Sequence, residues 1–178
     1  LLVSTPLFKG VLTSNVITKC IQLCKKNNIP TAVDPKLKHF LSYKGVTLFK
    51  PNLKEINEGL NLEVSGDNLE SLKAAIEALE GELENQISFV TLSENGVVIN
   101  EGGNFIHLPA HHRDIVDVSG AGDTVISVPA LCLARGANIK ELAELSNLAG
   151  GLVCEKVGVV TINKEELILA SENRLDVL

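Results

Sequence analysis

Short apolar runs alternate along this chain with longer segments in which apolar residues recur every three or four positions. Continuous apolar runs are typical of buried strands, and the longer spacing is typical of helices with one buried face. Thr13 or Ser14 is expected to cap the first helix, and Asp67 a later one. The expected strands are residues 1–4, 29–35, 46–52, 87–92, 96–100 and 104–109. The expected helices are residues 15–28, 68–82, 124–135 and 138–155, with a last one beginning near Asn163.

The order of these elements predicts an α/β protein. Strands that alternate with helices form a mainly parallel sheet with helices on both faces, a three-layer α/β/α arrangement. The runs 96–100 and 104–109 are separated by "EGG", which predicts an antiparallel hairpin. Sheets of this kind bind ligands beyond the carboxyl ends of their parallel strands, so the loops there are expected to carry the function.

Composition narrows the class of protein. The 178 residues are 45% hydrophobic and 21% charged, which is ordinary for one globular domain. The net charge is −6 and no basic tract is present, so we expect no nucleic-acid partner. No apolar run approaches the roughly 18 residues of a membrane span and no signal peptide is visible, so we expect a cytoplasmic protein without a membrane partner. The four cysteines lack zinc-site spacing and are expected to be small buried residues.

The stretch VDVSGAGDTV, residues 116–125, carries a chemical signal. Glycine-rich turns at helix starts expose backbone N–H groups, which together with the helix dipole attract anions such as phosphate. A carboxylate at Asp123, beside such an anion, suits a base that takes a proton from an attacking hydroxyl in phosphoryl transfer, or a group that helps to hold a metal. The alternative is structural, with Asp117 or Ser119 capping the helix and the glycines forming a tight turn.

The full string DVSGAGDTV resembles the signature D-T-x-G-A-G-D of the ribokinase-like carbohydrate kinases, the PfkB family, with Val118 in place of threonine. The resemblance implies a Rossmann-like α/β fold, an ATP-dependent sugar kinase, and Asp123 as the catalytic base that deprotonates a sugar hydroxyl. It also places Asp117 and Ser119 near a monovalent-cation site of some members. The N–H groups expected to stabilise the transferring phosphoryl group are those of Gly120, Ala121 and Gly122.

Two further strings resemble elements of that family in the same order. FKPNLKEI carries an N-x-x-E element at Asn52 and Glu55, which in relatives organises magnesium-bound water and phosphate; as an alternative, Asn52 caps a helix. VTLSENGV resembles the strand-to-turn segment that contacts the nucleotide phosphates, and Asn95-Gly96 also suits a plain hairpin turn. The nucleotide-binding residues implied by this second string are Ser93, Glu94 and Gly96.

The segment ELSNLAGGLVCEKVG, residues 144–158, resembles the late helix beside the adenine pocket of these kinases. The resemblance places Asn147, Ala149 and Gly150 near the base, although small residues at Ala149 and Gly150 equally favour close helix packing. Val116 would line the same pocket or belong to the core.

Within the family, IPTAVDPKLKHFLSYKGVTLFKPNLKEI is similar to bacterial heptose-7-phosphate kinases, the kinase half of the bifunctional ADP-heptose synthesis protein. This implies D-glycero-β-D-manno-heptose 7-phosphate as acceptor, ATP as donor with Mg²⁺, and a role in lipopolysaccharide-core synthesis. Asp34 and Lys36 would bind the substrate, Lys36 by meeting a phosphate; the alternative is a solvated loop lysine. A solvated or nucleotide-rim role is expected for His111, His112 and Arg113.

The resemblance covers nearly the whole chain, with one departure. STPLFKGVL lacks the Asp and Tyr that the subfamily has there, which puts an acceptor contact in doubt. We expect residues 1–178 to be the carboxyl-terminal part of one ribokinase-like kinase domain, lacking its amino-terminal half, and family members often form homodimers. The alternatives are a PfkB-family kinase for another sugar or sugar phosphate and a non-catalytic nucleotide-binding module.

Overall fold

A six-stranded sheet forms the centre of the protein, in the strand order β1-β2-β3-β4-β5-β6. The computed structural model describes residues 2–4, 12–110 and 115–175. Strands β1 to β4 run parallel, and β5 and β6 continue the sheet as an antiparallel hairpin. This confirms the expected mainly parallel sheet with its hairpin. The strands are β1 (Leu2–Ser4), β2 (Thr31–Val33), β3 (Leu48–Phe49), β4 (Ile87–Thr91), β5 (Val97–Glu101) and β6 (Asn104–Leu108).

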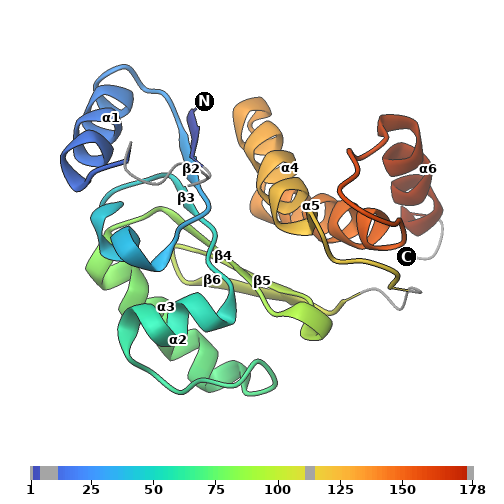
Figure 1. Ribbon diagram of the computed structural model, residues 1–178, viewed down its shortest axis with the longest axis horizontal. Helices are drawn as coiled ribbons and strands as arrows, with labels where there is room; N and C mark the ends of the chain where they lie inside the picture. The colour runs from blue at the N-terminus through green and yellow to red at the C-terminus, as the bar shows by residue number, and fades with distance from the viewer. Residues whose placement is uncertain (1, 5–11, 111–114, 176–178) are drawn as a thin grey trace.

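Helices cover both faces of the sheet and complete the three layers (Figure 1). Helices α1, α2 and α3 lie on one side, and α4, α5 and α6 on the other. The α-helices are α1 (Ser14–Lys26), α2 (Leu53–Leu60), α3 (Leu69–Leu83), α4 (Ala121–Arg135), α5 (Ile139–Cys154) and α6 (Lys164–Leu175). None of the helices within the described residues is long and apolar enough to cross a membrane.

The strands send alternate side chains into two separate cores, because neighbouring strand residues point to opposite faces. Val33, Phe49 and Val90 pack with α1, α2 and α3. Ala32, Leu48 and Phe89 pack with α4 and α5. Burial on both faces explains why these strands read as continuous apolar runs in the sequence.

Of the two helix caps expected from the sequence, one is confirmed and one is shifted by a residue. Thr13 caps α1, as expected, through its hydroxyl and the N–H of Val16. Asp67 was expected to cap α3, but Asn68 does so, because its Oδ1 accepts from the N–H of Ser71 at 3.1 Å. The carboxylate of Asp67 instead accepts from the hydroxyl of Ser65. The expectation of buried cysteines is also wrong for Cys20, which is exposed on α1.

The turn between β4 and β5 requires glycine at position 96. Gly96 has φ +87°, and a Cβ there would lie 2.1 Å from the carbonyl oxygen of Leu108. The N–H of Leu92 donates to the carbonyl of Gly96 across the turn. The expected hairpin turn is therefore present, and its backbone packs closely against the end of β6.

Candidate active site

The start of α4 has no side-chain cap. Gly120 occupies the N-cap position with φ +78°, and no side chain accepts from the first-turn N–H groups. By contrast, α1, α2, α3 and α5 each begin with a side-chain cap, at Thr13, Asn52, Asn68 and Asn138 respectively. The first N–H groups of a helix have no partner within the helix. The start of α4 therefore presents a positive dipole end and N–H groups that no side chain caps, although the N–H of Ala121 donates to the backbone carbonyl of Val118 at 3.3 Å. The interpretation that Asp117 or Ser119 caps the helix is wrong.

Asp117 braces the loop that precedes this helix start. Its Oδ1 accepts from the N–H of Ser119, and its Oδ2 accepts from the N–H of Gly158, both at 2.9 Å. Hydrogen bonds from the side chain and N–H of Ser119, with that from Gly158, lower the pKa of Asp117 below its ordinary value. The carboxylate therefore keeps its negative charge while tying the loop to the turn after α5.

The same turn supports Gly120 from the other side. A Cβ at Gly120 would lie 2.9 Å from Cγ1 of Val159, in addition to requiring a left-handed backbone. The glycine therefore lets the loop pack against the connection between α5 and α6. The N–H groups of Val116 and Asp117 both donate to the carbonyl of Cys154, which fixes the loop further.

Asp123 lies in the first turn of α4 with its side chain exposed. Among the described residues its carboxylate makes no hydrogen bond or ion pair. Only its backbone carbonyl is used, by the hydroxyl of Ser127 at 2.7 Å. Ala121 and Gly122 complete the turn, and an added Cβ at Gly122 would meet nothing within 4 Å. An exposed carboxylate is thus held beside first-turn N–H groups that no side chain caps.

A second group of predicted residues lies where β3 enters α2. Asn52 caps α2, and with Glu55 it forms a capping box: Asn52 Oδ1 accepts from the N–H of Glu55 at 2.8 Å, and Glu55 Oε2 accepts from the N–H of Asn52 at 2.9 Å. The structural interpretation of Asn52 is therefore confirmed. Glu55 is nonetheless buried, and its Oε1 lies 3.6 Å from Nζ of Lys36, an ion pair.

Lys50 is a buried lysine that sequence reasoning missed. Its Nζ lies 2.9 Å from Oδ1 of Asp34, and the two side chains are 4% and 13% exposed. Oδ1 of Asp34, a residue expected to bind substrate, is paired with this ammonium. A signal was present in the sequence, because Lys50 ends the otherwise apolar run VTLF. A charge in a buried run requires a partner.

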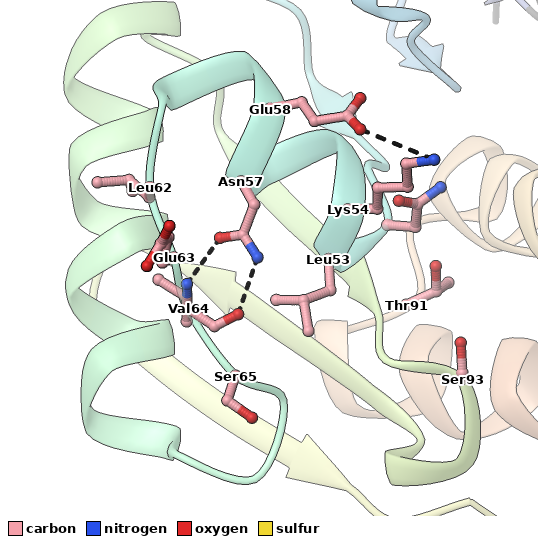
Figure 2. Close-up of a pocket in the computed structure, with 11 residues that line it drawn as sticks. Leu53, Lys54, Asn57, Glu58, Leu62, Glu63, Val64, Ser65, Thr91 and Ser93 are labelled. Carbon is pink, nitrogen blue, oxygen red and sulfur yellow. Dashed lines mark hydrogen bonds and ion pairs between the residues drawn. The ribbon is translucent and has the colours of Figure 1, made fainter.

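An open groove beside α2 brings two of the predicted elements together (Figure 2). Asn52 lines the groove with Ser93 and Thr91, and Asn52 forms a bridge with Thr91 across the strand ends. Asn57 holds the far wall through paired hydrogen bonds with the backbone of Val64, each 2.8 Å. Ser93 and the neighbouring Glu94 are exposed, as a nucleotide contact requires, whereas Gly96 is buried in the turn.

The residues expected near adenine divide into two kinds. Val116 is exposed, so the core interpretation is wrong for it. Asn147 is buried and donates through Nδ2 to the carbonyl of Pro109 at 3.0 Å. Gly150 is buried where α5 meets α4, and a Cβ there would lie 2.7 Å from Cγ2 of Val125. Close helix packing therefore accounts for a glycine at position 150. Residues 111–113, expected at the nucleotide rim, and most of STPLFKGVL lie outside the described residues.

Replacing Gly150 by alanine tests this packing role. Alanine favours helices over glycine by about 1 kcal/mol, but overpacking a close contact costs about 1–3 kcal/mol. We expect the free energy of unfolding to fall by about 1 kcal/mol. In Gly81→Ala, at an α3 position with open space around the added methyl group, it is expected to rise by about 0.5–1 kcal/mol. Urea denaturation of both variants measures the difference, and equal effects would contradict the packing role.

The sequence was compared with protein families and with curated proteins. The pfkB family carbohydrate kinase pattern matches residues 1–166. The bifunctional protein HldE of Syntrophotalea carbinolica is 39% identical over 160 residues, which cover 89% of this chain and 32% of that protein. The chain thus spans about a third of the length of this curated relative.

Solved structures share the fold. Phosphofructokinase-2 from Escherichia coli, in complex with potassium, has a TM-score of 0.82 at 19% identity and covers 91% of this chain and 53% of its own. Arabidopsis thaliana ribokinase, complexed with ribose and ATP, has a TM-score of 0.77 at 17% identity, covering 89% of this chain and 52% of its own. These likenesses confirm the ribokinase-like fold. The family match over residues 1–166 and the 39% identity to HldE over 89% of the chain show that the chain belongs to the pfkB family of carbohydrate kinases.

Proposed function

We propose that this chain supplies the catalytic base and the nucleotide-binding half of an ATP-dependent sugar kinase. The observation that carries the proposal is the uncapped start of α4, with Asp123 exposed in its first turn. Asp123 would accept the proton of the attacking sugar hydroxyl. The N–H groups of the turn at 120–122 would stabilise the charge that develops on the γ-phosphoryl group during in-line transfer. The carboxylate of Asp123 has no other partner among the described residues, whereas the N–H of Ala121 also donates to the carbonyl of Val118 at 3.3 Å.

Magnesium fits the residues at the α2 start. Mg²⁺ usually keeps several waters and is bound through one or two carboxylates plus substrate phosphates. Glu55 offers one such carboxylate, because its Oε1 accepts no hydrogen bond from the described residues and meets only the ammonium of Lys36. Bound there, the cation would neutralise phosphate charge during transfer. We propose that Ser93 and Glu94, at the groove that Asn52 also lines, contact the nucleotide phosphates.

A monovalent cation is proposed beside the loop at 117–119. The charged carboxylate of Asp117, whose pKa is lowered, supplies a negative field there. Phosphofructokinase-2 from Escherichia coli was solved in complex with potassium, and its fold is the same. Because both oxygens of Asp117 already accept N–H bonds, its role would be to shape the loop around the cation.

For the acceptor we propose D-glycero-β-D-manno-heptose 7-phosphate, phosphorylated at its anomeric hydroxyl. The identity to HldE supports this choice. Lys36, exposed at the carboxyl end of β2, is proposed to meet a phosphate, and Asp34 to act on the acceptor site through Lys50.

A sugar panel tests the proposal. The complete gene product would be assayed for ATP consumption with heptose 7-phosphate, fructose 6-phosphate, fructose and ribose. Turnover with the heptose alone is the expected result. Turnover with another sugar would retain the mechanism and overturn the acceptor. ADP binding without turnover on any sugar would favour a nucleotide-binding module.

A further inference from the structure

Two ion pairs connect the segment that follows β2 with the segment that follows β3, and each segment supplies one lysine and one carboxylate. Lys50, after β3, pairs with Asp34 after β2, and Lys36, after β2, pairs with Glu55 after β3. The two pairs differ in burial. The Lys50 side chain is 4% exposed and its Nζ is 2.9 Å from its carboxylate, whereas the Lys36 side chain is 60% exposed and 3.6 Å away. One pair is therefore fixed inside the protein, and the other is held at the surface by charge alone.

Glu55 is the unusual member of the second pair. Its side chain is only 10% exposed, so its negative charge has little water around it. One oxygen, Oε2, accepts from the N–H of Asn52. The other, Oε1, faces Lys36 beyond hydrogen-bond distance. A desolvated carboxylate needs a counter-charge. In the structure that counter-charge is the ammonium of Lys36, whose side chain is 60% exposed.

We propose that Lys36 is an exchangeable counter-ion of Glu55 and that a divalent cation displaces it. The inference rests on the proposed function, because it takes Glu55 as the carboxylate that holds magnesium. An ammonium and a dication repel each other at the same oxygen, so they compete for Oε1. Lys36 can leave at little cost, since its stem is solvated and its pair is long. The lysine thereby lowers the affinity of the empty site for divalent cations and keeps the Glu55 carboxylate compensated until the cation arrives.

The test is a Mn²⁺ titration of the complete gene product without nucleotide or sugar, followed by electron paramagnetic resonance of the free ion. Lys36→Met keeps the stem and removes the competing charge. We expect it to tighten Mn²⁺ binding about two- to fivefold, the range of an exposed ion pair. Lys140→Met is the matched control, because Lys140 is 63% exposed and lies 3.8 Å from Glu144 on α5. It is expected to leave Mn²⁺ binding unchanged.

Glu55→Gln separates the inference from the function on which it rests. It is expected to weaken Mn²⁺ binding and, combined with Lys36→Met, to abolish the gain. If Glu55→Gln weakens binding but Lys36→Met does not tighten it, the exchange is overturned and the metal role of Glu55 stands. If Lys36→Met binds no Mn²⁺, the exchange is also overturned. If Glu55→Gln leaves Mn²⁺ binding intact, both the exchange and the metal role of Glu55 are overturned, and the sugar panel still decides the kinase activity.

Discussion

Replacement of Asp123 by asparagine is expected to lower turnover about 10²- to 10⁴-fold, the range of general-base catalysis. Asparagine has nearly the same shape but takes no proton, so the sugar hydroxyl would lose its acceptor. ATP binding should be retained, because the N–H groups at the start of α4 belong to the backbone. Steady-state kinetics of the complete gene product with its sugar, together with nucleotide titration, measure both quantities.

The competing explanation of Asp123 is a favourable charge at the helix start. Such a charge is worth typically about 0.3–1 kcal/mol of stability, and its loss would leave turnover nearly unchanged. Asp67→Asn serves as the control, since Asp67 is an exposed carboxylate just before α3. It is expected to keep full turnover. Turnover of Asp123→Asn within a few fold of the parent would remove Asp123 from the chemistry.

The second large effect is on stability. Asp34→Asn is expected to lower the free energy of unfolding by about 3–5 kcal/mol, because it leaves the ammonium of Lys50 buried without a counter-charge. Replacing the ammonium by an apolar side chain, in the double variant Asp34→Asn with Lys50→Met, should recover much of this loss, since the stranded charge is gone. Urea denaturation of the single and double variants measures the effect.

The surface pair of Lys54 and Glu58 gives the scale against which this loss is judged. Their charged atoms are 3.7 Å apart, with side chains 81% and 42% exposed. Glu58→Gln is therefore expected to change stability by no more than about 0.5 kcal/mol. A loss of that size for Asp34→Asn, or a double variant no more stable than the single one, would show that Lys50 reaches water when its partner is removed.

The features of the fold that the sequence predicts are the strands, helices and turns, which depend on residues close together in the chain. The apolar runs ending at Val33, Phe49 and Thr91 are strands in the structure, and the "EGG" segment joins a hairpin. The turn before Asp123 does begin a helix. These features follow from backbone geometry and from a period of two or of three to four residues, which the chain carries along its own length. Boundaries were less exact: Asn68 rather than Asp67 caps α3, because adjacent polar residues offer equivalent caps.

The sequence by itself thus determined the element order, the α/β class and the glycine-rich start of α4. Only the tertiary structure decided which charges meet. The pairs of Lys50 with Asp34 and of Lys36 with Glu55 join the segments after β2 and β3, which the parallel pairing of these strands brings together. Gly150 likewise reveals its packing role only where α4 crosses α5. The physical reason is range: propensity and periodicity act over a few residues, whereas burial and charge pairing depend on which distant segments the sheet register places side by side.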